Sequence, residues 1–96
     1  AIRVLIADDH PVVRTGLREM LQDRAQFIVV GEASDGAEAV AQARALRPDA
    51  IVMDVSMPRL DGIEATRLIH REFPSIQILG LSTQTATAHP HPIEDA

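Results

Sequence analysis

A short apolar run that ends on a carboxylate is the feature that most constrains this chain. Residues 50–53 read Ala-Ile-Val-Met, and Asp54 follows them directly. A run this short, with β-branched residues and no charge, is typical of a strand buried inside a parallel sheet. Residues 58–62 (PRLDG) then predict a loop that leads into a helix. Because ligands bind at the carboxyl ends of strands in open parallel sheets, Asp54 is a candidate site residue.

The same alternation of apolar run and helical pattern occurs along the rest of the chain. Further strands are predicted at 2–7, 27–33 and 76–81, and helices at about 11–24, 37–47 and 62–73. Strand–helix–strand units of this length imply a parallel sheet with right-handed crossovers. Gly16 costs up to about 1 kcal/mol relative to alanine inside the first helix, so we expect tight packing there.

Composition limits the classes of function. The 96 residues, 46% of them hydrophobic, allow one small domain, and no apolar run approaches the roughly 18–20 residues that span a membrane. The chain has no cysteine, which excludes disulfides and thiolate metal sites. A net charge of −5 argues against direct contact with nucleic acid, since phosphate binding needs clustered basic residues. We therefore expect a soluble, cytoplasmic protein that binds neither membranes nor nucleic acid.

Three carboxylates are expected to meet at one edge of the sheet. Asp8 and Asp9 end the first predicted strand. Asp54 ends the third, and Ser82 follows the fourth. Carboxylates in one pocket repel one another unless protons or a cation compensate. Oxygen ligands suit Mg²⁺, and the backbone carbonyl of Ser56 offers a further oxygen. Such a pocket also suits phosphoryl transfer, which depends on positioning and charge neutralisation.

Simpler roles stay open for the single residues. Asp8 and Asp9 alone could cap the first helix, and Ser82 alone is a weak signal because many strands end in serine. Because Asp8, Asp9 and Ser82 occur together with Asp54 at predicted strand ends, an acidic pocket is the favoured interpretation. The two histidines of the HPHP run at 89–92 would bind a metal only adventitiously.

Several motifs occur together at the predicted strand ends. They are LIADDHP at 5–11, IVMD at 51–54, MP at 57–58, DG at 61–62 and LS at 81–82. Together they resemble the receiver domain of bacterial two-component response regulators, and the motifs are most similar to those of the NarL/FixJ subfamily. The resemblance implies a flavodoxin-like (CheY-like) three-layer α/β fold with a parallel sheet, incomplete here, in strand order 2-1-3-4. It divides the chain into a partial receiver domain at 1–83 and an irregular C-terminal tail at 84–96.

The resemblance also implies a role for each candidate residue. Asp54 matches the phosphoacceptor, which takes a phosphoryl group from a histidine kinase. Asp9 matches the acid that binds Mg²⁺ directly, and Asp8 the acid that usually binds it through water. Ser56 matches the residue whose backbone carbonyl binds the ion. Ser82 matches the hydroxyl residue that contacts the phosphoryl group on activation.

The chain departs from the family pattern after the fourth strand. A receiver continues with a helix, a fifth strand ending in a Lys-Pro pair, and a fifth helix, whereas these 96 residues contain no lysine. Phosphorylated Asp54 would bring a charge of about −2, and with two further aspartates and Mg²⁺ the pocket would stay near −2. A lysine would leave it near −1. We therefore expect impaired phosphorylation, with Arg14 and Arg59 as differently placed cations.

Four functions compete for this pattern. The leading one is a receiver module that binds Mg²⁺ and accepts phosphate weakly. The second is a non-phosphorylated interaction module that competes with a full regulator for its histidine kinase. The third is a degenerate gene product with an unrelated ending after Thr83. An enzyme or nucleotide binder fits least, since the loop at 7–11 lacks a glycine-rich phosphate cradle and its aspartates are adjacent.

The predicted sheet leaves its fourth strand at an edge. Residues 76–81 are apolar and carry neither charge nor proline, and such an edge pairs readily with another chain. The missing helices would also uncover apolar surface. We therefore expect a homo-oligomer formed through this strand, with two-fold symmetry.

Overall fold

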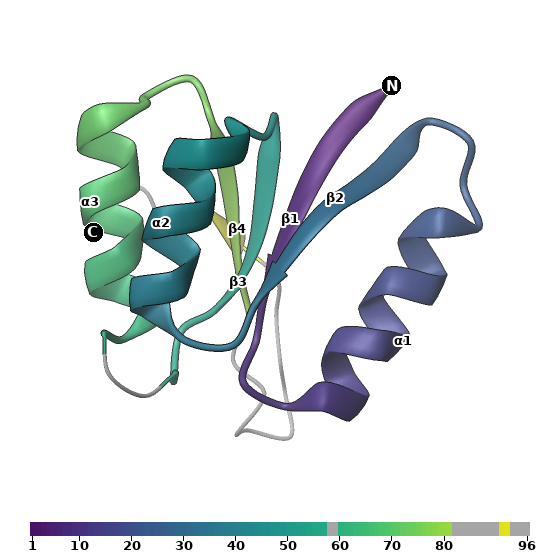
Figure 1. Cartoon of the computed structure of the whole chain (residues 1–96), viewed down its shortest axis with the longest axis horizontal. Coiled ribbons are helices and arrows are strands. Elements are labelled where there is room, and N and C mark those ends of the chain that lie inside the picture. The colour runs from purple at the N-terminus through teal and green to yellow at the C-terminus, as the bar shows by residue number, and fades with distance from the viewer. Residues whose placement is uncertain (58–59, 82–90, 93–96) are drawn as a thin grey trace.

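The computed structural model describes residues 1–57, 60–81 and 91–92 (Figure 1). Its elements in chain order are β1 (Ile2–Ala7), α1 (Pro11–Gln22), β2 (Phe27–Ala33), α2 (Gly36–Leu46), β3 (Ala50–Asp54), α3 (Gly62–Glu72), β4 (Gln77–Leu81) and β5 (His91–Pro92). The sheet order is β2-β1-β3-β4-β5, with β1 to β4 parallel and β5 antiparallel to β4. The predicted parallel sheet and its order 2-1-3-4 are confirmed. Within the described ranges, every helix is too short and too polar to cross a membrane.

Each helix begins where the sequence supplies a suitable first turn. Pro11 occupies the start of α1, where its missing N–H is not needed. The side chain of Asp35 accepts a hydrogen bond from the backbone N–H of Glu38 at the start of α2 (2.7 Å). Asp61 does the same for Glu64 at the start of α3 (2.8 Å). These caps satisfy N–H groups that have no partner inside the helix.

The main hydrophobic core lies between the sheet and the pair α2 and α3, which lie side by side on one face (Figure 1). Alanines on the two helices let the backbones approach the strands closely, and larger side chains from β1, β3 and α3 fill the remaining space. The fully buried members include Leu5, Ala39, Ala43, Ile51, Met53, Ala65 and Ile69. This layer fixes β3, the strand that ends on Asp54.

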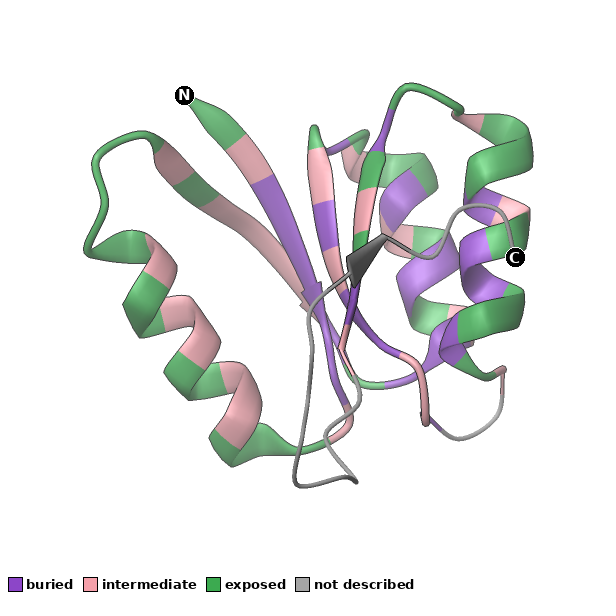
Figure 2. Cartoon of the chain, turned by 180° about the vertical axis from the view of Figure 1, so that it is seen from behind, coloured by how far each residue is buried: buried purple, intermediate pink, exposed green. Residues whose placement is uncertain are grey.

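α1 alone covers the opposite face. α1 is described in full, and none of its residues is buried, whereas α2 and α3 both carry buried stretches (Figure 2). Val4 and Ile6 of β1 are buried on this side, but Leu79 of β4 stays 38% exposed. A hollow of about 280 Å³ lies over β3 and β4, with Leu21 of α1 among its lining residues. Among the described residues, the sheet is therefore closed on one face and half-open on the other.

Gly16 of α1 does not pack tightly. A Cβ atom added there would meet no heavy atom of the described residues within 4 Å. The expectation of tight packing at Gly16 is wrong, because this side of α1 faces away from the sheet.

The edge beyond β4 also differs from the expectation. Leu79 and Gly80 pair with Pro92 and His91 of β5, so within the predicted irregular tail these two residues form a short strand. An apolar strand with unpaired backbone groups attracts any extended segment within reach, and proline is tolerated at such an edge. β4 is thus not a free edge over these positions. The other residues of 84–96 lie outside the described ranges, and the division at residue 83 stays a prediction.

Candidate functional site

The structure brings together the three aspartates at the carboxyl ends of β1 and β3. These strands are adjacent and parallel, and Ala7 is paired with Met53, so the residues that follow leave the sheet at the same edge. Asp8 and Asp54 are 1% and 0% exposed. One oxygen from each of Asp8, Asp9 and Asp54 and one ring nitrogen of His10 lie within 4.8 Å of one another. We refer to these four residues as the acidic cluster.

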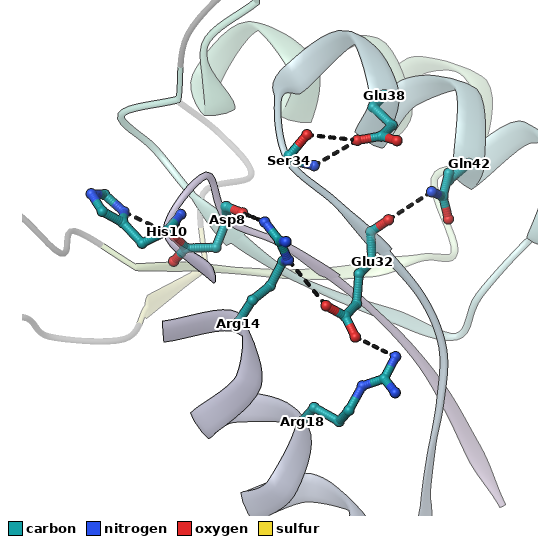
Figure 3. Close-up of polar contacts among 8 residues, drawn as sticks. All are labelled: Asp8, His10, Arg14, Arg18, Glu32, Ser34, Glu38 and Gln42. Atoms are coloured by element: carbon teal, nitrogen blue, oxygen red, sulfur yellow. Dashed lines mark hydrogen bonds and ion pairs between the residues drawn. The ribbon is translucent and has the colours of Figure 1, made fainter. Parts of the chain in front are cut away.

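Polar contacts with α1 and β2 hold the β1 side of the acidic cluster (Figure 3). The Nη1 of Arg14 donates to the backbone carbonyl of Asp8 (2.8 Å), and its Nε donates to Glu32 of β2 (3.0 Å). Glu32 also forms an ion pair with Arg18. Arg14 and Arg18 of α1 therefore share the half-buried carboxylate of Glu32. The positive charge of Arg14 is thus paired with the carboxylate of Glu32 on β2.

Backbone contacts hold the β3 side. The N–H of Val55 donates to the carbonyl of Leu81 (3.0 Å), and the N–H of Gly62 donates to the carbonyl of Val55 (3.2 Å). A Cβ atom at Gly62 would overlap the backbone carbonyl of Asp54, so only glycine permits this close approach. The N–H of Ser56 donates to Oδ1 of Asp54 (3.0 Å), which orients the carboxylate.

Burial is the main influence on the charge of Asp54. It raises the pKa of this carboxyl above its ordinary value, the hydrogen bond from Ser56 lowers it, and the charges of Asp8 and Asp9 raise it further. The Oδ2 atom of Asp8 is buried and has no hydrogen-bond partner among the described residues. A buried carboxylate oxygen without a partner costs folding free energy, because it has lost its hydration. A cation bound in the pocket would offset this cost.

His10 supplies part of that compensation. Its Nδ1 atom lies 3.0 Å from Oδ1 of Asp8, 3.0 Å from Oδ1 of Asp9 and 3.8 Å from Oδ2 of Asp54. The hydrogen bond to Asp8 and the charge of Asp9 raise the pKa of the imidazole. His10 was not among the residues predicted from the sequence. Its position directly after the aspartate pair is the signal that could have identified it.

The remaining predicted site residues are placed as follows. Ser56 lies directly beyond Asp54 and contacts it through its backbone N–H. Ser82 and Arg59 lie outside the described residues. Leu81, the residue before Ser82, is paired with Asp54 in the sheet. Three carboxylates, one of them with an unpartnered buried oxygen, form a donor set that fits a hard divalent cation.

Comparison with known proteins assigns a family to this arrangement. Residues 4–93 match the response regulator receiver domain. The response regulator GacA of Pseudomonas viridiflava is 47% identical over 81 residues, which cover 84% of this chain and 38% of that protein. The chain thus spans less than two fifths of the length of this relative.

Solved structures agree with the sequence matches. A LuxR-family two-component response regulator from Aurantimonas aligns with a TM-score of 0.79 and 41% identity, over 83% of this chain and 57% of the other. The response regulator domain of Thermotoga maritima CheB aligns with a TM-score of 0.83 and 40% identity, over 92% and 66%.

Proposed function

Because the chain belongs to the response regulator receiver domain family, we propose that it is a phosphoacceptor module of two-component signal transduction. Asp54 is the acceptor, and a histidine kinase is the donor. The observation that carries this proposal is a fully buried aspartate at the end of a central strand, with two further aspartates beside it. The carboxyl end of a central parallel strand is where such folds bind ligands.

The residues of the chain then have distinct tasks in the transfer. The carboxylate of Asp54 attacks the phosphorus of the donor phosphohistidine, the P–N bond breaks, and the imidazole nitrogen leaves with the bonding electrons. The N–H of Ser56 holds Oδ1 of Asp54 and so fixes the direction of attack. Ser82 is proposed to contact the transferred group. Such positioning supplies most of the catalysis in phosphoryl transfer.

Mg²⁺ is the cofactor that we propose for the acidic cluster. Asp8, Asp9, Asp54 and the backbone carbonyl of Ser56 would hold it. When bound, the ion neutralises charge on the phosphoryl oxygens. The unpartnered Oδ2 of Asp8 supports this assignment. In a Mg²⁺ titration followed by amide chemical shifts, we expect changes at 8–10 and 54–57, and their absence would contradict the proposal.

We also propose that this 96-residue chain accepts phosphate only weakly. It contains no lysine, and Arg14 is occupied by Glu32 and the carbonyl of Asp8. By charge count, phosphorylated Asp54, Asp8, Asp9 and Mg²⁺ sum to about −2, whereas a lysine would leave about −1.

Intact mass after incubation with acetyl phosphate and Mg²⁺ tests the acceptor. We expect a minor fraction of the chain to gain one phosphoryl group, and Asp54→Asn to abolish the gain. Asp61→Asn is the matched control, because it removes an exposed acid nearby while keeping the helix cap. A gain that persists in Asp54→Asn would reject Asp54 as acceptor, and a complete gain would reject the proposed weakness.

The pairing of β5 with Leu79 and Gly80 weakens the prediction that the chain self-associates through the β4 edge. Self-association stays a prediction that rests on the half-open face. Light scattering at high protein concentration tests it, and a monodisperse monomer would contradict it.

A further inference from the structure

A nitrogen donor lies in the middle of the acidic cluster. The Nδ1 atom of His10 is 3.0 Å from one oxygen of Asp8 and 3.0 Å from one oxygen of Asp9. The third aspartate, Asp54, places Oδ2 3.8 Å from the same nitrogen. In Figure 3 the imidazole lies on one side of Asp8 and the guanidinium of Arg14 on the other. The Nδ1 atom of the imidazole lies near side-chain oxygens of all three aspartates, whereas Arg14 contacts Asp8 through its backbone carbonyl.

These separations fit the edges of a coordination polyhedron. When an octahedral ion is bound at about 2.1 Å, neighbouring ligand atoms lie about 3.0 Å apart. Both short distances from His10 match such an edge. The imidazole of His10 is 49% exposed and the side chain of Asp9 is 29% exposed, so both can adjust around an ion. Asp8 and Asp54 are buried and provide the fixed part of the cluster.

Hydrogen bonding alone leaves the cluster unsatisfied. One Nδ1–H can serve one acceptor well, and it has hydrogen-bond geometry only toward Oδ1 of Asp8. Oδ2 of Asp8 is a buried atom without a hydrogen-bond partner among the described residues, whereas Oδ1 of Asp9 is buried but lies within ion-pair distance of Nδ1 of His10. Asp8 itself is 1% exposed, so water has little access to it. One orphaned buried oxygen, Oδ2 of Asp8, in a group of three carboxylates around a ring nitrogen points to a bound cation.

We propose that His10 is a protein ligand of this cation through Nδ1, and that it shifts the site toward transition-metal dications such as Mn²⁺ and Co²⁺. Carboxylates suit both Mg²⁺ and Mn²⁺, whereas imidazole favours the transition metals. In the bound form Nδ1 carries the lone pair and Nε2 the proton, a tautomer that neutral imidazole allows. The inference rests on the proposed function, because it uses the same carboxylates.

Binding of Mg²⁺ and Mn²⁺ to wild type and to His10→Phe, measured by titration calorimetry, tests the selectivity. Phenylalanine keeps a planar ring and removes both nitrogens. All proteins, including the reference that we call wild type, carry His89→Asn and His91→Asn, so that the HPHP run cannot bind the metal. We expect the preference for Mn²⁺ over Mg²⁺ to fall at least about tenfold in His10→Phe, the scale of a lost metal-site interaction. His70→Asn, on the exposed side of α3, is the matched control and leaves the preference unchanged.

Pulsed electron paramagnetic resonance of bound Mn²⁺ gives a second readout. A coupled ¹⁴N nucleus is expected in wild type and in His70→Asn, and its loss in His10→Phe and His10→Ala. In His70→Asn, His10 is the one histidine left in the 96 residues, so this spectrum decides the matter even where the His10 variants fail to fold.

Three outcomes overturn the inference. An unchanged metal preference without nitrogen coupling shows that His10 is not a ligand. Tighter binding of both ions in His10→Phe shows that His10 acts as an internal cation that competes with metals. Absence of any Mg²⁺ or Mn²⁺ binding in wild type rejects the proposed magnesium site itself, and this inference with it.

Discussion

The two faces of the sheet differ in how completely they are covered. On the face of α2 and α3, Ile51, Met53 and Ile69 are at most 1% exposed. On the other face, α1 contributes no buried residue among those described, and Leu79 stays 38% exposed. Apolar packing therefore holds α2 and α3 to the sheet, whereas α1 combines half-buried apolar side chains with ion pairs from Arg14 and Arg18 to Glu32 of β2.

This difference divides the acidic cluster into two halves. Asp54 belongs to the closely packed half, because β3 is covered by α2 and α3 and the loop after it contacts Gly62. Asp9 and His10 belong to the connection between β1 and the loosely packed α1. The structure thus combines a fixed Asp54 with more adjustable neighbours. An ion that must be bound and released suits such an arrangement.

Truncation of one large side chain on each face tests this difference with the largest expected effect. Ile69→Ala removes a side chain that is 1% exposed, and we expect a loss of about 3 kcal/mol in the free energy of unfolding. Leu17→Ala removes an isomeric side chain from the half-buried side of α1, and we expect about 1 kcal/mol. Urea unfolding measures both. Equal losses would show that α1 closes its face as tightly as α3 does.

Gly62→Ala tests the backbone contact that positions Asp54. The added Cβ would overlap the carbonyl of Asp54 and the Cα of Val55, so the loop must move. We expect a loss of about 1–3 kcal/mol in the free energy of unfolding, the usual cost of overpacking. Amide chemical shifts at 54–56 should change along with it. A variant of unchanged stability and unchanged shifts would contradict the contact.

Asp54→Asn should stabilise the chain at neutral pH when no divalent cation is present. The pKa of Asp54 is raised in the folded state, so the ionised carboxylate costs folding free energy. This cost is absent below the unfolded pKa near 3.8 and is complete once the pH exceeds the folded pKa. We expect a gain in the free energy of unfolding at neutral pH that disappears in acid. Asparagine can still accept the hydrogen bond from Ser56.

Unfolding as a function of pH, in the presence of a chelator, measures this gain. Asp61→Asn is the control for net charge, because it removes one exposed acid. A gain of equal size in the control, or a gain that persists in acid, would show that burial of Asp54 is not the cause.

The sequence could predict the sheet and the meeting of the aspartates because both depend on local pattern and connectivity. Short apolar runs that alternate with helices permit few topologies, and parallel strands bring Asp8 and Asp54 to one edge. His10 was missed because its contacts depend on side-chain torsions in the loop after β1. β5 was missed because two residues carry no periodicity, and their pairing with β4 is not local.

The error at Gly16 has a different origin, and it leads to the smallest expected effect. A glycine inside a helix costs stability, and the sequence cannot show whether close packing compensates for this cost. In α3, Gly62 is compensated by its contact with the backbone of Asp54, whereas Gly16 meets no described heavy atom within 4 Å of its would-be Cβ. Gly16→Ala should therefore stabilise the chain by about 0.5–1 kcal/mol, through helix propensity alone. Urea unfolding of Gly16→Ala and Gly62→Ala side by side should give changes of opposite sign. A loss of stability in Gly16→Ala would mean that the outward side of α1 packs against something in solution.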